Sequence, residues 1–184
     1  MYSIWLLPSE KESKRFQKII DTLSESFKTP VFEPHLTLYT SIPVLSDELF
    51  YKISVLAALT SVFDLSIVQL QTSSHYFKSL FSTIENNKTL QELQKEIENL
   101  FPNIEYNFQP HLSLLYGEVE DNLKNEKIES IQEKLINVFQ VNRIAIVANQ
   151  GEPNNWKIIE TFDFHQTEDS HLEFVFETVK NLKV

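Results

Sequence analysis

The chain has 184 residues, of which 42% are hydrophobic, and its formal net charge at pH 7 is −10. Its length fits one domain, or two small lobes that share a core, and its hydrophobic content excludes wholesale disorder. Its acidity argues against a surface that binds long nucleic acid, since Lys and Arg contacts to phosphates supply much of that affinity, whereas a small anionic ligand in a local pocket is compatible with it.

Strand and helix patterns alternate through the first half of the chain. Residues 2–7 are rich in β-forming side chains, and Ser9 with Glu12 three positions later is typical of a helix N-terminus. Apolar residues at helical spacing continue from there to Phe27. The remaining patterns of this half predict a strand at 35–42, a helix from Ser46 or Asp47 to Leu59, and strands at 63–72 and 75–84.

The second half repeats much of this order without the leading strand. A helix that begins at Asn86 or Asn87 precedes a strand at 108–117. The patterns that follow predict a helix over 128–136, strands at 139–148 and 156–164 around a turn at 149–155, and a final strand at 171–179. The repetition indicates one unit over residues 1–184, with two lobes of mixed α and β structure and antiparallel sheets.

One seven-residue frame occurs twice, as FEPHLTL at 32–38 and as FQPHLSL at 108–114. Side chains on a strand alternate between its two faces, so His35 and Thr37 share one face and the leucines share the other. His111 and Ser113 are paired in the same way in the second frame. If the leucines are buried and the two lobes face each other, one cleft receives two histidines and two hydroxyls.

Two histidines and two hydroxyls around one cleft suit an in-line displacement at a phosphate. One neutral imidazole takes a proton from the attacking water, and the other, as an imidazolium, protonates the leaving oxygen. The hydroxyls of Thr37 and Ser113 can donate hydrogen bonds to the phosphate oxygens, where charge accumulates in the transition state. This chemistry needs no metal. The near symmetry of the frames leaves open which histidine is the acid and which is the base.

A structural turn or a metal site would account for less of the repeated frame. A duplicated structural turn explains the prolines and leucines, but not a titratable residue at both centres. Two histidines could bind zinc together with a carboxylate, yet Glu33 in the first frame has Gln109 as its counterpart, so no acid is repeated. The remaining histidines, His75, His165 and His171, lie in no repeated context, and we expect them to be structural.

Composition excludes several other kinds of site. The chain has no cysteine, which rules out disulfides, cysteine-ligated zinc and a cysteine nucleophile. Gly117 and Gly151 are too far apart to build a glycine-rich phosphate loop. No apolar run approaches the roughly 18 residues of a membrane helix, and the first residues are typical of a strand rather than a signal peptide. We therefore expect a cytoplasmic protein with no membrane contact.

The paired His-x-Thr and His-x-Ser motifs, at this separation in a chain of this size, resemble those of the two-histidine (2H) phosphoesterase superfamily. The opening YSIWLLP, the context FEPHLTL and the second motif HLSLLYG are most similar to its cyclic nucleotide phosphodiesterase branch. The resemblance implies a bilobal α+β fold in which two antiparallel sheets, related by a pseudo-twofold, flank a central cleft with helices outside.

The resemblance also implies an activity and a set of site residues. The implied reaction is metal-independent opening of a 2′,3′-cyclic phosphate to a 2′-phosphate, or of the 1″,2″-cyclic phosphate of ADP-ribose. By motif position, His35 and His111 are the acid–base pair, and Thr37 and Ser113 hold the phosphate. No cofactor is implied, and we expect a monomer whose partner is a small cyclic nucleotide.

Two aromatic residues match positions that line the substrate pocket in this branch, Trp5 and Tyr116. Aromatic faces can stack on nucleobases, which gives the match a physical basis. However, Tyr116 follows Ser113 by three positions, so strict alternation directs it to the opposite face of the strand. It can reach the cleft only where the strand bulges or ends, and Gly117 allows such a distortion.

Two further functions are compatible with the same motifs. One is an RNA end-processing enzyme of the 2′–5′ RNA ligase kind, which the acidity of the chain disfavours because RNA calls for a basic track beside the cleft. The other is a nucleotide-binding module of the same fold without turnover. The presence of all four motif side chains favours an active enzyme over such a module.

Overall fold

A computed structural model of the protein describes residues 1–102 and 106–165. Its strands are β1 (Tyr2–Pro8), β2 (Leu36–Ile42), β3 (Phe63–Thr72), β4 (Leu80–Ile84), β5 (His111–Leu115), β6 (Val138–Ala148) and β7 (Lys157–Asp163). Its α-helices are α1 (Glu10–Phe27), α2 (Asp47–Leu59), α3 (Lys88–Asn99) and α4 (Asp121–Gln132), and two short 3₁₀ turns are η1 (Tyr76–Lys78) and η2 (Pro153–Asn155). None of the helices in these two ranges is both long and apolar enough to cross a membrane.

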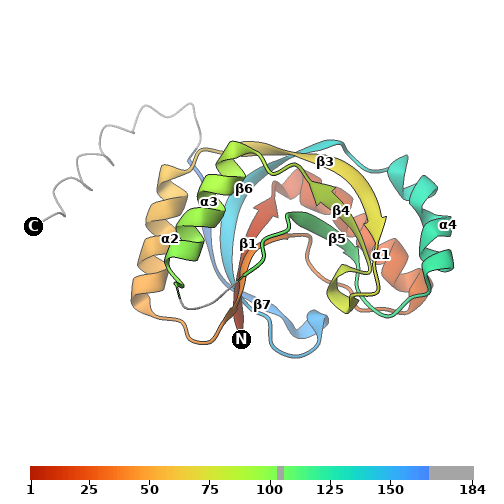
Figure 1. The fold of residues 1–184 in the computed structure, drawn as a ribbon, viewed down its shortest axis with the longest axis horizontal. Coiled ribbons are helices and arrows are strands. Elements are labelled where there is room, and N and C mark those ends of the chain that lie inside the picture. Colours follow the sequence, from red (N-terminus) through yellow and green to blue (C-terminus); the bar gives the residue numbers. More distant parts are fainter. Residues whose placement is uncertain (103–105, 166–184) are drawn as a thin grey trace, which may run out of the picture.

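The strands form a curled antiparallel sheet in the order β2-β1-β6-β3-β4-β5, with β7 also paired to β6 (Figure 1). Strand β3 joins its two parts, because Phe63–Ser66 pairs with β6 whereas Ile67–Thr72 pairs with β4. We call β2-β1-β6-β7 the His35 sheet and β3-β4-β5 the His111 sheet. The predicted α+β class with two antiparallel sheets is confirmed, and the two sheets are continuous along β3.

The helices cover the outside of this sheet (Figure 1). Helices α2 and α3 pack on β7 and β2 of the His35 sheet, and α4 packs on β3 of the His111 sheet. Helix α1 begins after Ser9, as predicted, but the Ser9 hydroxyl contacts the Glu12 carboxylate rather than a backbone N–H. The apolar stripe of α1 is buried against the strands, with Phe16 edge-on to Phe139 of β6.

Three predicted elements differ from the structure. The strand predicted at 75–84 begins only at Leu80, because the Ser73 side chain accepts from the His75 N–H and donates to the Lys78 carbonyl, which closes η1 instead. The helix predicted over 128–136 begins earlier, at Asp121, and ends at Gln132. The strand predicted at 108–117 is reduced to β5, which starts directly after Pro110. The strand predicted at 171–179 lies outside the described residues.

Gly117 lies just after β5 and is hydrogen-bonded to η1, and its backbone conformation requires glycine. Its φ is 112°, and an added Cβ would lie 2.7 Å from Cγ2 of Thr29. Its N–H donates to the Tyr76 carbonyl at 2.8 Å, which ties η1 to the end of the strand.

We predict that Gly117→Ala lowers the free energy of unfolding by about 1–3 kcal/mol, through backbone strain and the collision with Thr29. Urea denaturation of both proteins measures the loss. Gly151→Ala is the matched control, because its φ of 79° is also positive but no atom lies within 4 Å of the added Cβ. Equal losses in the two variants would contradict the steric part of this interpretation.

Candidate active site

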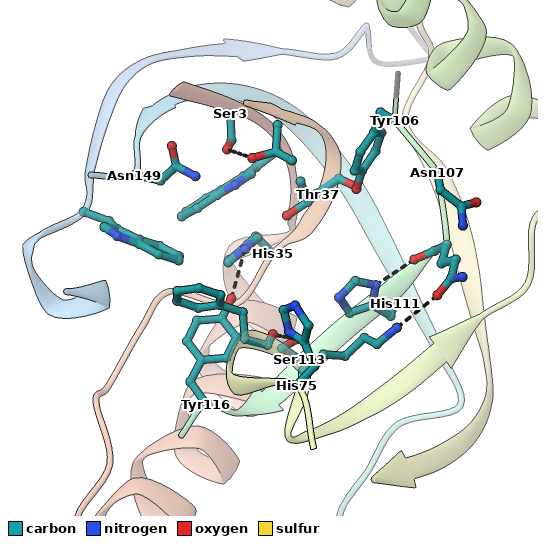
Figure 2. A pocket seen from close by; sticks show the side chains of 16 residues that line it. Ser3, His35, Thr37, His75, Tyr106, Asn107, His111, Ser113, Tyr116 and Asn149 are labelled. Atoms are coloured by element: carbon teal, nitrogen blue, oxygen red, sulfur yellow. Dashed lines mark hydrogen bonds between the residues drawn. The ribbon is translucent and has the colours of Figure 1, made fainter. Parts of the chain in front are cut away.

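The two repeated frames face one pocket with a volume of about 350 Å³. Figure 2 shows His35 and His111 on opposite sides of it, with Tyr116 and Ser113 below and Thr37 above. The structure brings together all six residues singled out from the sequence: Trp5, His35, Thr37, His111, Ser113 and Tyr116.

The alternation of side chains along each strand places the leucines in the core and the histidine and hydroxyl side chains in the pocket, as predicted. In the first frame, Leu36 and Leu38 are buried in the main hydrophobic cluster, while His35 and Thr37 line the pocket. In the second frame the leucines at 112 and 114 belong to the same cluster, and His111 and Ser113 line the pocket. Each frame therefore places apolar side chains in the core and polar side chains in the pocket, at alternate positions of the chain.

Both imidazoles are held by the same hydrogen bond. Nδ1 of His35 lies 2.6 Å from the Glu33 carbonyl oxygen, and Nδ1 of His111 lies 2.6 Å from the Gln109 carbonyl oxygen. A carbonyl can only accept, so Nδ1 carries the proton in both rings. Nε2 of each ring is thereby left as the atom that can take up or release a proton.

The surroundings of His35 are aromatic. The indole of Trp5 stacks on its imidazole, with ring centroids 3.5 Å apart and planes 7° from parallel, and Phe32 meets the ring edge-on. Only 6% of the residue is exposed. Burial lowers the pKa of His35 to about 3, against the opposing effect of the hydrogen bond to Glu33, and the nearby His111 lowers it further. His35 is therefore neutral in the free protein at neutral pH.

The surroundings of His111 are more open and more cationic. The residue is partly exposed, and Phe81 meets its ring edge-on. Burial again lowers the pKa of His111, the hydrogen bond to Gln109 opposes this, and the charges of Lys78 and His75 lower it further. The downward shift is smaller than that of His35, so His111 is the first of the two histidines to become charged as the pH falls.

A bulge in β5 brings Tyr116 into the pocket. Leu80 of β4 pairs with Leu115 but Phe81 pairs with Ser113, so Leu114 is an extra residue on β5. Leu114 and Leu115 both enter the core, and the next side chain returns to the pocket face. The distortion that the sequence allowed at this point is thus present, and strict alternation fails here.

Two interactions hold Tyr116 beside His35. Its ring stacks on Phe32, the first residue of the first frame, with centroids 3.6 Å apart. Its hydroxyl oxygen lies 3.5 Å from Nε2 of His35. Burial raises the pKa of Tyr116 above its ordinary value, so the hydroxyl stays protonated and can act as a hydrogen-bond donor at that nitrogen.

The two motif hydroxyls are not equivalent. The Ser113 hydroxyl donates to the backbone carbonyl of Phe77 in η1, at 3.0 Å. It must rotate away from that carbonyl before it can donate to a bound anion. Thr37 lies opposite Trp5 in the register of β1 and β2, and its side chain lines the pocket on the other side.

The pocket also contains residues that the sequence did not single out. Phe77 and Lys78 come from η1 and His75 directly precedes it, in a segment that the sequence pattern assigned to a strand, and Trp156 follows the turn at 149–155. His75 was expected to be structural and lies instead in the pocket wall. The sequence feature that could have found these residues is the cluster His-Tyr-Phe-Lys at 75–78, close before β4. Ser73 favours a turn at this point, and a turn would have indicated a loop of polar and aromatic side chains rather than a strand.

The charge of the pocket is opposite to that of the chain. Among its described lining residues are three histidines and Lys78, and none is an aspartate or glutamate. The chain as a whole has 26 acidic residues and a formal charge of −10. The pocket is therefore a local site for an anion on an otherwise acidic protein. His165 does not line this pocket, and its backbone forms an isolated β-bridge with Ser61. His171 is outside the described residues.

A model of the family described as "Cyclic phosphodiesterase-like protein" matches residues 1–173. The chain belongs to this family. The resemblance to the cyclic nucleotide phosphodiesterase branch of the 2H phosphoesterases is thereby confirmed.

Two curated proteins are similar to this chain over most of its length. A cyclic phosphodiesterase of Arabidopsis thaliana is 28% identical over 89% of this chain and 91% of its own length. A 2′,3′-cyclic-nucleotide 3′-phosphodiesterase of Kluyveromyces lactis is 26% identical over 86% of this chain and 84% of its own length.

Solved structures share the fold at lower sequence identity. The protein TT0787 of Thermus thermophilus has a TM-score of 0.60 and 16% identity, and covers 90% of this chain and 98% of its own. E. coli LigT in complex with 3′-AMP has a TM-score of 0.56 and 15% identity over the same shares of the two chains. These likenesses confirm the predicted 2H phosphoesterase-like fold.

We predict that His35 stays neutral as the pH is lowered from about 7 to about 4, whereas His111 takes up a proton earlier. Long-range ¹H–¹⁵N NMR of the imidazoles measures both titrations. An unfolded chain protonates histidine near pH 6.5, whereas burial lowers the pKa of His35 in the folded protein to about 3. Between these two pH values the unfolded state binds a proton at residue 35 that the folded state does not. The free energy of unfolding therefore falls as the pH falls through this window, and it should fall less in His35→Gln.

Proposed function

We propose that this protein is a hydrolase that opens 2′,3′-cyclic phosphates, or the 1″,2″-cyclic phosphate of ADP-ribose, by acid–base catalysis with His35 and His111. The observation that carries the proposal is the pair of imidazoles across one pocket. In each ring Nδ1 is bound to a carbonyl, which leaves Nε2 as the nitrogen for proton transfer. At His35 that nitrogen faces the Tyr116 hydroxyl at 3.5 Å, which must give way to the attacking water. The names of the curated relatives support the same class of reaction.

The proposed roles of the two histidines follow from their surroundings. His35 is desolvated between Trp5 and Phe32 and is neutral, so it acts as the general base that takes a proton from the attacking water. His111 is closer to solvent and accepts a proton more easily, so it acts as the imidazolium that protonates the leaving oxygen. A bound anion favours the charged form of both rings, which raises the pKa of each in the complex.

The other pocket residues stabilise charge and hold the substrate. We assign Thr37 and Ser113 as donors to the non-bridging phosphate oxygens, with Ser113 turning away from the Phe77 carbonyl. We assign Trp5 and Tyr116, which line the His35 end of the pocket, to contact with the nucleoside through the small part of each ring, 3% of either residue, that is exposed.

No step of this mechanism requires a metal, because the imidazoles and hydroxyls supply both the proton transfers and the phosphate contacts. In the ranges that the structure describes, no three His, Asp or Glu side chains converge as metal ligands. The proposed cut is at the bond between phosphorus and O3′, which leaves a 2′-phosphate. The name of the Kluyveromyces lactis relative, a 3′-phosphodiesterase, is consistent with that choice.

We further propose that the whole chain works as one two-lobed unit with one motif in each lobe, as a monomer on small nucleotides. The shared strand β3 supports this, because it pairs with both β6 and β4. A long nucleic acid is not expected as the substrate of so acidic a chain.

Steady-state hydrolysis of 2′,3′-cyclic AMP with excess chelator tests the proposal. We expect turnover that the chelator does not affect, and a loss of about 10²–10⁴ in kcat for His35→Ala and for His111→Ala. Nucleotide binding without turnover would identify a binding module instead.

The dependence of kcat/KM on pH should be bell-shaped with a maximum below about pH 6.5, because the pKa of each histidine is lowered in the free protein.

A substrate with sulfur in place of O3′ separates the two histidine roles. A thiolate leaves without protonation, so the His111→Ala variant should lose less than about tenfold on the sulfur substrate, whereas His35→Ala should lose about 10²–10⁴ on both substrates. Initial rates with the two substrates measure this. The reverse pattern would exchange the acid and the base.

A further inference from the structure

The two ends of the pocket differ in chemistry. The His35 end is aromatic, with Trp5 stacked on the imidazole and Tyr116 beside it. The His111 end is polar and cationic, with Lys78, His75 and Gln109 among its lining residues. A substrate that spans the pocket therefore meets apolar faces at one end and positive charge at the other.

Lys78 is held in place without a charge partner. Its Nζ donates to Oε1 of Gln109 at 3.0 Å and lies 4.9 Å above the ring of Phe81. Within the described part of the chain it forms no ion pair with a carboxylate. An oriented cation with no anion beside it, in a pocket wall without acids, suits a bound anion.

The segment that carries Lys78 is fixed to its surroundings. Two backbone carbonyls of η1 accept hydrogen bonds from β5 and the turn after it. The Phe77 carbonyl accepts from the Ser113 hydroxyl of β5 at 3.0 Å, and the Tyr76 carbonyl accepts from the N–H of Gly117, just past the strand, at 2.8 Å. The buried Lys124 of α4 donates to the Ser73 carbonyl at 2.7 Å, just before η1. The position of the cation is thus set before any ligand arrives.

Lys78 does not share the reacting side of His111. Gln109 accepts from His111 Nδ1 with its backbone carbonyl and from Lys78 with its side chain. Nε2, the atom proposed to serve the cyclic phosphate, is on the other side of the imidazole ring. Through Gln109 the charge of Lys78 is linked to the Nδ1 side of His111, so we infer that it is available to a group beyond the cyclic phosphate.

The geometry of ribose identifies which group that is. C5′ is attached to C4′, next to C3′, whereas the base is attached to C1′, next to C2′. If O3′ leaves toward His111, the 5′ substituent is directed to the Lys78 end and the base to the aromatic end.

We propose that Lys78, with His75 beside it, forms a second anion subsite, and that the preferred substrates carry a 5′-phosphate group in addition to the cyclic phosphate. This inference rests on the proposed function for the placement of O3′. It also runs against the overall charge of the chain, since a protein of formal charge −10 repels a more highly charged ligand unless a local cation attracts it.

Binding of product analogues tests the subsite without turnover. Calorimetry compares adenosine 2′,5′-bisphosphate with 2′-AMP on wild type, Lys78→Met and Lys78→Arg. We expect wild type to bind the bisphosphate roughly tenfold more tightly, the value of one charge-assisted hydrogen bond. The preference should vanish in Lys78→Met and be kept in part in Lys78→Arg. Lys88→Met, which removes an exposed cation from α3 outside the pocket, should leave the preference unchanged.

The same comparison with adenosine 2′,3′-cyclic phosphate, with and without a 5′-phosphate, should give the same ratio in kcat/KM. Equal affinity of wild type for the two analogues, or an equal loss for both in Lys78→Met, overturns the subsite. Failure of wild type to hydrolyse either cyclic phosphate overturns the proposed function instead, and the binding ratio still decides the subsite. His75→Gln is a second variant, at an exposed position, and should reduce the preference in part.

Discussion

The hydrogen bond from each imidazole Nδ1 to the carbonyl two residues before it is the constraint on which the rest of the site depends. It spans a proline in both frames, Pro34 in the first and Pro110 in the second. A proline has a fixed φ and forces the residue before it into an extended conformation. The carbonyl of Glu33 or Gln109 is thereby presented to the ring that follows. The prolines of the frame therefore help to select the tautomer in which Nδ1 carries the proton and Nε2 does not.

The scaffold gives the two histidines the same hydrogen bond and different surroundings. At His35, stacking on Trp5 and burial disfavour the charged ring, whereas at His111 solvent is closer and Lys78 supplies a fixed charge. The same hydrogen bond combined with different solvation would give the proposed base and the proposed acid from one repeated motif. The difference arises from neighbours outside the frames, so the motif alone is symmetric and the folded site is not.

The sheet contributes this asymmetry through local departures from regular pairing. The extra residue at Leu114 changes the face to which the end of β5 directs its side chains, so Tyr116 returns to the pocket. Gly117, which follows it, donates its N–H to the Tyr76 carbonyl of η1. Tyr116 then stacks on Phe32, so that the first frame supports a residue that follows the second. The two halves of the site are therefore linked by packing as well as by the continuous strand β3.

The amino-acid sequence by itself determined the repeated frame, the faces of its side chains and most of the elements, because alternation and helical periodicity are local properties. His35, Thr37, His111 and Ser113 could be selected from it for that reason. It could not place η1, where hydrogen bonds of Ser73 replaced a strand, and so it missed Lys78 and the position of His75. Only the tertiary structure decided which residues from distant segments surround each histidine. The pKa of an imidazole depends on its burial and on the charges around it, and both depend on such contacts. These contacts therefore distinguish the two imidazoles, which the sequence presents as equivalent.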